Sequence, residues 1–157
     1  MYELEKWVWS HHDFDVMGWH DATVHAFALV PEQFELLLDI DYIVKWEEPE
    51  PPDVYYTFWV SPATLVFEGV QDIKIDLDIE NIQNIDLQGI EREGPVPAPN
   101  GELIDWNWNV EANQGSMRFR AAGYTQYFRR APIRIREQGL EVSQRGGLSF
   151  ERVQSNR

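Results

Sequence analysis

All four histidines of the chain lie within its first 25 residues, and several aspartates accompany them. Imidazole and carboxylate groups bind zinc, manganese and iron, and a metal with an open coordination position activates water for hydrolysis. One hypothesis is therefore a metal-dependent enzyme that uses zinc or manganese. Its candidate ligands are His11, His12, Asp13, His20 and His25.

The spacing of these residues matches no metal-binding motif, and paired-histidine motifs need a helix that the pattern does not indicate. Ligands must converge in space, which closeness in the sequence does not ensure. The alternative is that the histidines lie on the surface or in turns, where Asp13 and Asp21 cap turns through their side-chain oxygens. The six serines also lack the Gly-x-Ser-x-Gly context of a hydrolase nucleophile. We favour the second interpretation, which makes the chain a binding protein with no catalytic residue and no cofactor.

Pairs of aspartates recur at a spacing of two residues, as in Asp39 with Asp41 and Asp76 with Asp78. On a strand such a pair lies on one face about 7 Å apart, within the range that glycosidases use. With 27 acidic residues among 157, however, such pairs arise by chance. We interpret them as a solvated acidic face that binds a partner. The residues of this face are Asp39, Asp41, Asp76, Asp78 and Glu80.

The chain has seven tryptophans, which could form a platform for a carbohydrate or another small ligand. The segment 105–109 mixes Trp106 and Trp108 with aspartate and asparagine. Both rings share a strand face with Ile104 and Val110, so packing in the core is the favoured interpretation. A carbohydrate- or small-ligand-binding β domain stays an alternative.

Arginine alternates with apolar residues near the end of the chain, at Arg118 and Arg120 and again at Arg134 and Arg136. Such a set could bind an anion. Arginine also suits fixed, two-point pairing with carboxylates, which are plentiful on the other strands of the chain. We expect internal pairing, which would help to set strand order and register.

The net charge of −14 is divided unevenly. Residues 1–111 hold 4 basic and 24 acidic residues, whereas 112–157 hold 9 arginines and 3 glutamates. An acidic surface repels nucleic acid and anionic lipid, so a basic protein is the expected partner and nucleic acid is not. Self-association stays open. The absence of cysteine excludes thiolate chemistry and disulfides and suits the cytoplasm.

No export signal or membrane span is expected. The segment Met1–Trp7 lacks the basic start and apolar core of a secretion signal. The longest apolar stretches are interrupted by charges, so none approaches the roughly 20 residues that cross a bilayer.

Alternation of apolar and polar residues with a period of two is the main structural pattern, and it predicts strands. It is clearest over 33–46, which is long enough that we expect a bend or bulge. Similar segments run over 73–80, 104–111, 117–121 and 133–136. Proline-rich stretches at 47–53 and 94–101 predict exposed connections.

Short connections between eight to ten strands favour antiparallel order, because parallel pairs need long crossovers. We therefore predict a mainly β fold, an antiparallel sandwich or open barrel, in a single domain spanning 1–157. Residues 1–20 would form an aromatic flap over the sheet. A last strand is expected within 140–150, followed by a frayed tail over 151–157.

Two segments carry a resemblance to a family: Gly18-Trp19-His20-Asp21-Ala22-Thr23-Val24 and Leu65-Val66-Phe67-Glu68-Gly69-Val70. They resemble small uncharacterised bacterial β-rich proteins, some relatives of which are predicted immunity proteins of polymorphic toxin systems. The resemblance implies no catalytic residues. The leading hypothesis is a non-catalytic bacterial interaction protein, of the immunity type, that inhibits a basic protein by binding it.

Overall fold

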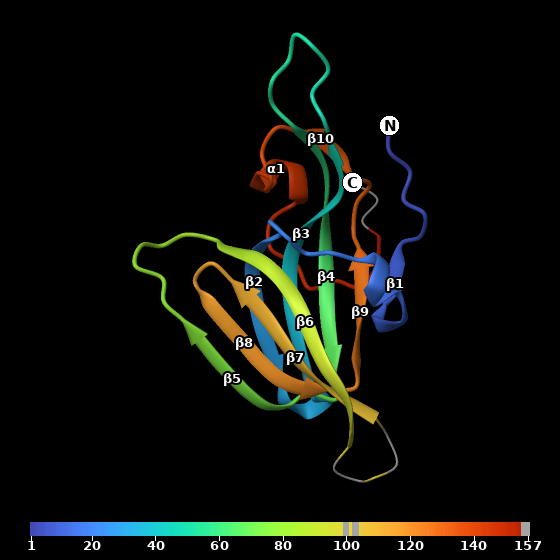
Figure 1. Ribbon diagram of the computed structural model, residues 1–157, viewed down its shortest axis with the longest axis vertical. Helices are drawn as coiled ribbons and strands as arrows, with labels where there is room; N and C mark the ends of the chain where they lie inside the picture. Colours follow the sequence, from blue (N-terminus) through green and yellow to red (C-terminus); the bar gives the residue numbers. More distant parts are fainter. Residues whose placement is uncertain (99–100, 102–103, 155–157) are drawn as a thin grey trace.

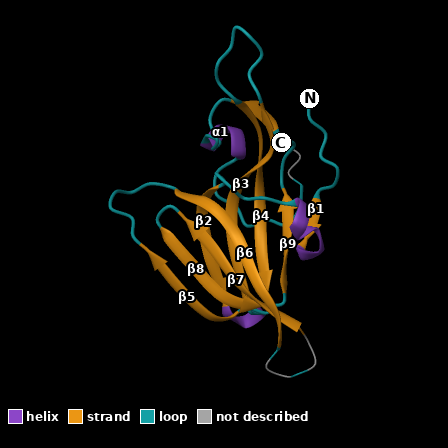
Figure 2. Ribbon diagram, in the orientation of Figure 1, coloured by secondary structure: helices purple, strands orange, loops and turns teal. Residues whose placement is uncertain are grey.

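The alternating segments form ten β-strands in the computed structural model, which describes residues 1–98, 101 and 104–154. The strands are β1 (Val8–Ser10), β2 (Thr23–Val30), β3 (Glu35–Glu47), β4 (Thr57–Glu68), β5 (Gln71–Leu77), β6 (Ile85–Pro97), β7 (Ile104–Ala112), β8 (Gly115–Ala121), β9 (Gly123–Phe128) and β10 (Ile133–Ile135). The helical segments are the 3₁₀ helices η1 (His11–Val16) and η2 (Pro31–Gln33) and the short α1 (Val142–Arg145). Strands make up most of the molecule (Figures 1 and 2). Within the described residues, no helix is long and apolar enough to cross a membrane.

The strands pair antiparallel throughout. Nine of them follow the order β1-β9-β4-β3-β2-β6-β7-β8-β5, and β10 pairs with β4 beside this path. The predicted mainly β, antiparallel fold is confirmed, and the sheet stays open instead of closing into a barrel. The bulge expected in the long alternating segment is present, because the register of β3 with β4 shifts between Ile43 and Lys45.

The sheet folds over where β2 meets β6, since these two strands share only two residue pairs. As a result, the half that contains β4 and β9 packs against the half that contains β7 and β8. The ring of Phe67 in β4 lies 4.7 Å from that of Phe119 in β8, and Trp108 in β7 lies 5.7 Å from Tyr124 in β9. These edge-to-face contacts are the favoured geometry for aromatic pairs. One apolar core therefore lies between the two halves.

The predicted aromatic flap packs against this core. Phe14 in η1 lies 5.7 Å from Trp108 and 5.9 Å from Trp19. The guanidinium group of Arg92 in β6 lies 4.4 Å from the ring centre of Phe14 and 4.1 Å from that of Trp106. Cation–π contacts of this kind fasten η1 to the edge of β6 and β7.

The C-terminal segment covers the outer face of β3 and β4. Leu140 packs there with Ile43, Phe58 and Val60. The predicted last strand within 140–150 is wrong, because this segment forms only α1 and irregular structure. Gly146 and Gly147, with φ of 83° and 81°, interrupt any extended run.

The first residues of the predicted tail contact the sheet. The carbonyl oxygen of Glu151 accepts a hydrogen bond from Thr64 at 2.6 Å, and Arg152 pairs with Glu35 at 2.6 Å. These contacts hold the start of the tail against β3 and β4. Residues 155–157 of the predicted tail, and 99–100 of the second predicted loop, lie outside the described residues.

Candidate functional site

The N-terminal histidines do not converge. His11 stacks on His12 and packs against Gly123, whereas His20 pairs with Asp21 at 3.0 Å and His25 pairs with Asp41 at 2.6 Å. Within 1–98, 101 and 104–154 no three His, Cys, Asp or Glu side chains are placed to hold a metal. The proposed metal site of His11, His12, Asp13, His20 and His25 is therefore wrong. The histidines lie apart because they stand on different elements. His11 and His12 lie on η1, His20 lies between η1 and β2, and His25 lies on β2.

Asp13 has the capping role that the alternative interpretation gave it. Its carboxylate accepts a hydrogen bond from the backbone N–H of Ser10 at 3.0 Å and one from Lys6 at 2.7 Å. The hydrogen bond from Lys6 contributes most to a pKa for Asp13 below its ordinary value. The pKa of His11 is also lowered, first by burial and then by the neighbouring charge of His12. These contacts hold the start of η1 in place.

Asp39 and Asp41 are buried, with 0% exposure each, so the prediction that they belong to a solvated acidic face is wrong. They do point away from the main core, as the odd positions of β3 must. The C-terminal segment covers that face and excludes water from it. Apolar Leu37 and Ile43 on the same strand face were the sequence signal that this side is covered.

Asp39 accepts four hydrogen bonds, which keep it ionised. Arg145 donates two of them, at 2.6 and 3.0 Å, Arg129 donates one at 2.7 Å, and the backbone N–H of Ser149 donates one at 3.0 Å. Burial acts to raise the pKa of Asp39, but the hydrogen bond from Arg145 and the charge of Arg129 outweigh it, so the pKa lies below its ordinary value. Burial likewise opposes a raised pKa for Arg145, and the bond to Asp39 overcomes it.

Asp41 extends this buried network. Its Oδ1 accepts a hydrogen bond from the Nε of Arg145 at 3.0 Å. Its Oδ2 accepts one from the backbone N–H of Leu140 at 2.8 Å and lies 2.6 Å from the Nε2 of His25. No hydroxyl group among the described residues forms a hydrogen bond with His25, so the pair lacks the nucleophile of a catalytic triad. Asp39, Asp41, Arg129 and Arg145 together form one buried network of ion pairs. It is the means by which the C-terminal segment is fastened to β3.

The expectation of internal arginine pairing is confirmed for part of the set. Besides the buried network, Arg134 pairs with Glu47 at 3.1 Å and Arg152 with Glu35 at 2.6 Å. Arg120 also lies 3.5 Å from Asp105, so five arginines of the basic last third pair with carboxylates of the acidic part. Arg118 and Arg136 of this set form no ion pair with another described residue.

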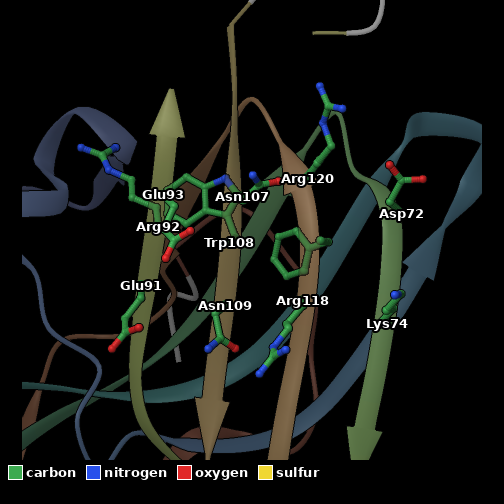
Figure 3. A pocket seen from close by; sticks show the side chains of 11 residues that line it. Asp72, Lys74, Glu91, Arg92, Glu93, Asn107, Trp108, Asn109, Arg118 and Arg120 are labelled. Atoms are coloured by element: carbon green, nitrogen blue, oxygen red, sulfur yellow. The ribbon is translucent and has the colours of Figure 1, made fainter. Parts of the chain in front are cut away.

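Arg118 lies in an open groove on the polar face of β5, β6, β7 and β8, with a volume of about 540 Å³. Figure 3 shows Glu91 and Glu93 on one side, the two asparagines of β7 in the middle, and the basic side chains of β8 and β5 beyond them, with Asp72 beside Lys74 on β5. The strand register explains this order. Glu91 of β6 pairs with Asn109 of β7, Asn109 pairs with Arg118 of β8, and Arg118 pairs with Lys74 of β5. The sequence correctly predicted which side chains share a face on each strand. It did not show that these faces of β6, β7, β8 and β5 lie next to one another.

The charges in this groove are largely free of internal partners. Arg120 donates to the carbonyl oxygen of Pro97 at 2.6 Å and lies 3.5 Å from Asp105. Among the described residues, Glu91, Glu93 and Lys74 form no ion pair. The glutamates of β6 and the basic side chains of β8 and β5 therefore lie on opposite sides of the two asparagines and do not pair with each other.

The two tryptophans of β7 pack against the core. Trp108 is buried in the core, and its indole N–H donates to the carbonyl oxygen of Ala121 at 3.1 Å. Trp106 is covered by the guanidinium group of Arg92. Core packing is thus confirmed for Trp108, and Trp106 is partly buried against the same core.

The connection between β3 and β4 forms a second exposed feature, which we call the acidic hairpin (residues 46–56). It extends beyond the sheet at the top of Figure 1. Four large apolar side chains on it are exposed: Trp46 (43%), Val54 (73%), Tyr55 (70%) and Tyr56 (46%). Four carboxylates lie among them: Glu47, Glu48, Glu50 and Asp53. The predicted exposed connection is confirmed, but the sequence did not indicate that the adjoining aromatic residues would be exposed as well.

The base of the acidic hairpin is well braced. Glu47 accepts a hydrogen bond from the indole N–H of Trp59 at 2.9 Å and pairs with Arg134. The bond from Trp59, helped by the charge of Arg134, holds the pKa of Glu47 below its ordinary value. The tip closes with a turn in which the N–H of Asp53 donates to the carbonyl of Glu50 at 2.8 Å. A rigid base therefore presents an exposed tip.

The other predicted partner-binding residues, Asp76, Asp78 and Glu80, are exposed at and beyond the end of β5. Their role stays a prediction. Comparison with protein-family models, with curated proteins and with solved structures finds no match to this chain.

Proposed function

We propose that this chain is a non-catalytic interaction protein that binds a basic protein through its acidic hairpin. The observation that carries the proposal is the exposure of Tyr55, Tyr56 and Trp46 on an element that projects from the fold. Tyrosine and tryptophan are enriched among the residues that dominate binding energy at protein interfaces. Exposed apolar side chains gathered in one place commonly mark such interfaces.

The charge of the hairpin supports a basic partner. Glu48, Glu50 and Asp53 form no ion pair with another described residue, unlike the buried Asp39 and Asp41. The surplus of acid that remains after internal pairing is thus available to attract a partner. Complementary charge accelerates encounter and fixes orientation, while the aromatic side chains supply contact area.

An immunity-type inhibitor in the bacterial cytoplasm is the specific form of this proposal. Such a protein needs an exposed binding surface, and the acidic hairpin offers one. The resemblance to predicted immunity proteins supports a toxin as the partner, and the absence of cysteine supports a reducing compartment.

Two matched variants test the proposal. The hairpin variant carries Glu48→Gln, Glu50→Gln and Asp53→Asn. The control variant carries Asp76→Asn, Asp78→Asn and Glu80→Gln, which removes the same number of carboxylates from the end of β5. The partner is first identified by cross-linking and mass spectrometry in native cells, and the affinity of each variant for that purified protein is then measured at several salt concentrations.

We expect the hairpin variant to bind at least about tenfold more weakly, with a smaller dependence on salt, and the control to bind like wild type. A second variant, Tyr55→Ala with Tyr56→Ala, should lose binding with little change in salt dependence. If the control loses binding and the hairpin variant does not, the end of β5 is the binding face and the hairpin assignment is wrong. If no basic partner is cross-linked at low salt, the function itself is wrong.

A second candidate function is the binding of a small charged ligand in the groove on β5–β8. The observation that favours it is the set of unpaired, opposite charges on Glu91 and Arg118, separated by the amide of Asn109. A ligand with a carboxylate and an ammonium group, such as an amino acid or a dipeptide, would pair with both sides at once. Thermal-shift measurements with such ligands test this candidate, with Arg118→Gln as the variant that should abolish the shift. The absence of any shift at millimolar ligand would contradict it.

A further inference from the structure

β5 ends the sheet with a free edge that is open to pairing. It pairs with β8 on one side and with no other described strand. The opposite end of the sheet, β1, has three residues, whereas β5 has seven and no proline. A long edge strand without proline presents unpaired N–H and C=O groups that can hydrogen-bond to another strand.

The sequence of β5 is self-complementary when two copies run antiparallel with Ile75 opposite Ile75. In that register Lys74 of each copy lies opposite the second copy's Asp76, and Ile73 lies opposite the second copy's Leu77. Residues directly opposite each other share a sheet face, so both charged pairs fall on one face and all the apolar pairs on the other. We propose that the chain forms a symmetric dimer through β5 in this register.

The exposure of Ile75 supports a second copy as the occupant of this edge. Ile75 is 39% exposed although Met117, its neighbour on β8, is 2% exposed on the same face. A strand added beside β5 would cover that apolar side chain. A self-complementary interface of this kind closes on itself as a two-fold dimer.

The paired segment is limited to residues 73–77. Before it, Asp72 has a φ of 56° and the register with β8 shifts between Gln71 and Lys74, so Asp72 leaves the regular strand. After it, Asp78 lies beyond the end of β5. In a longer pairing, Asp72 of each copy would lie opposite Asp78 of the second copy. The two breaks keep both aspartates out of the regular ladder.

Charge exchange provides the test. Asp76→Lys places lysine opposite lysine, and Lys74→Asp places aspartate opposite aspartate, so each variant alone should weaken dimerisation at least about tenfold. An equal mixture of the two variants restores both oppositely charged pairs between unlike copies. Sedimentation in about 0.15 M salt, which screens the net charge of −14 on each copy, measures the change from 18.4 kDa to twice that mass.

We expect wild type to dimerise, each single variant to be monomeric, and their mixture to form a mixed dimer. Asp15→Lys, which makes the same charge change in η1, should dimerise like wild type. The inference is overturned if wild type is monomeric at all concentrations up to about 1 mM, if the mixture stays monomeric, or if Asp15→Lys dissociates the dimer as strongly as Asp76→Lys. Circular dichroism of each variant establishes that it is folded.

The register has its own test, since the chain has no cysteine. In the proposed pairing Ile75→Cys places two sulfur atoms opposite each other, where cross-strand side chains are close enough to be joined. Mild oxidation should therefore convert this variant to a covalent dimer. Ile79→Cys, at a position of similar exposure beyond the paired segment, should stay uncoupled, and coupling at 79 in place of 75 would overturn the register.

This dimer goes beyond the proposed function and does not rest on it. The acidic hairpin connects β3 and β4, which lie inside the strand order, whereas the dimer edge is β5 at one end of it. Binding of a basic partner and self-association are measured separately, so either proposal can fail without the other.

Discussion

Arg145 and Asp39 lie 106 residues apart in the chain and form a two-point ion pair in its interior. Nη2 of the arginine donates to one carboxylate oxygen at 2.6 Å and Nη1 donates to the other at 3.0 Å. The same guanidinium group reaches Asp41 through Nε at 3.0 Å. One side chain thus fastens the C-terminal segment to β3 at two positions.

Removal of Arg145 should be strongly destabilising. Arg145→Met leaves two buried carboxylates with fewer donors, and breaking a buried ion pair from one side typically costs about 3–5 kcal/mol. We expect a loss of this size in the free energy of unfolding measured by urea denaturation. Arg152→Met is the control, because its pair with Glu35 is partly exposed and such pairs contribute about 0–1 kcal/mol. Equal losses in the two variants would contradict the dominance of the buried pair.

The buried network also predicts how stability depends on pH. The pKa of Asp39 is lower in the folded protein than its ordinary value of 3.8, so its ionised form favours the folded state. This contribution is fully present above about pH 4 and is lost as the pH falls through the folded pKa, because the unfolded chain takes up the proton first. The destabilisation caused by Asp39→Asn should therefore be constant from neutral pH to about pH 5 and should shrink below pH 4. Urea denaturation of both proteins across this range checks it, and a difference that grew toward low pH would have the wrong sign.

The turn between β7 and β8 requires glycine at position 115. Gly115 has a φ of 141°, and a Cβ there would collide with the backbone carbonyl of Asp76 on β5. We expect Gly115→Ala to destabilise the protein by about 2 kcal/mol or more, since both backbone strain and a steric clash oppose it. Gly89→Ala is the matched control, because its Cβ would meet no atom within 4 Å and its φ is ordinary. Similar melting temperatures for the two variants would contradict this account.

Local pattern predicted the strands well, because the alternation of side chains is a property of neighbouring residues. Most of the segment 33–46 became β3 (Glu35–Glu47) with its expected bulge, although Gln33 lies in η2 and Phe34 has a φ of 55°. The proline-rich segment 47–53 became an exposed connection. The fate of Asp39 and Asp41 depended instead on a segment about 100 residues away that covers the outer face of β3. Alternation shows that two residues share a face, but it does not show whether another part of the chain covers that face.

The candidate sites were harder to predict for the same reason. The clustering of histidines is a feature of the sequence alone, and β2 carries His25 into a contact with Asp41 while His11 stays in the flap. The groove on β5–β8 needs the order of four strands, which places Glu91 beside Asn109 and Lys74 beside Arg118. Tyr55 and Tyr56 are exposed because the ladder of β3 with β4 ends at the pair of Glu47 with Thr57, which leaves both tyrosines beyond it.

Arg92 should control how firmly the aromatic flap is closed. Its guanidinium group lies between the rings of Phe14 and Trp106, and cation–π contacts that are partly shielded from water contribute about 1–2 kcal/mol. In Arg92→Gln we expect the amide hydrogens of η1 to exchange faster while those of β3 and β4 keep their protection, because the flap opens without unfolding the core. Arg118→Gln is the control, since Arg118 is exposed and contacts no ring. If exchange in η1 is unchanged in Arg92→Gln, the flap is held by Phe14 and its contacts with Trp108 and Trp19 alone.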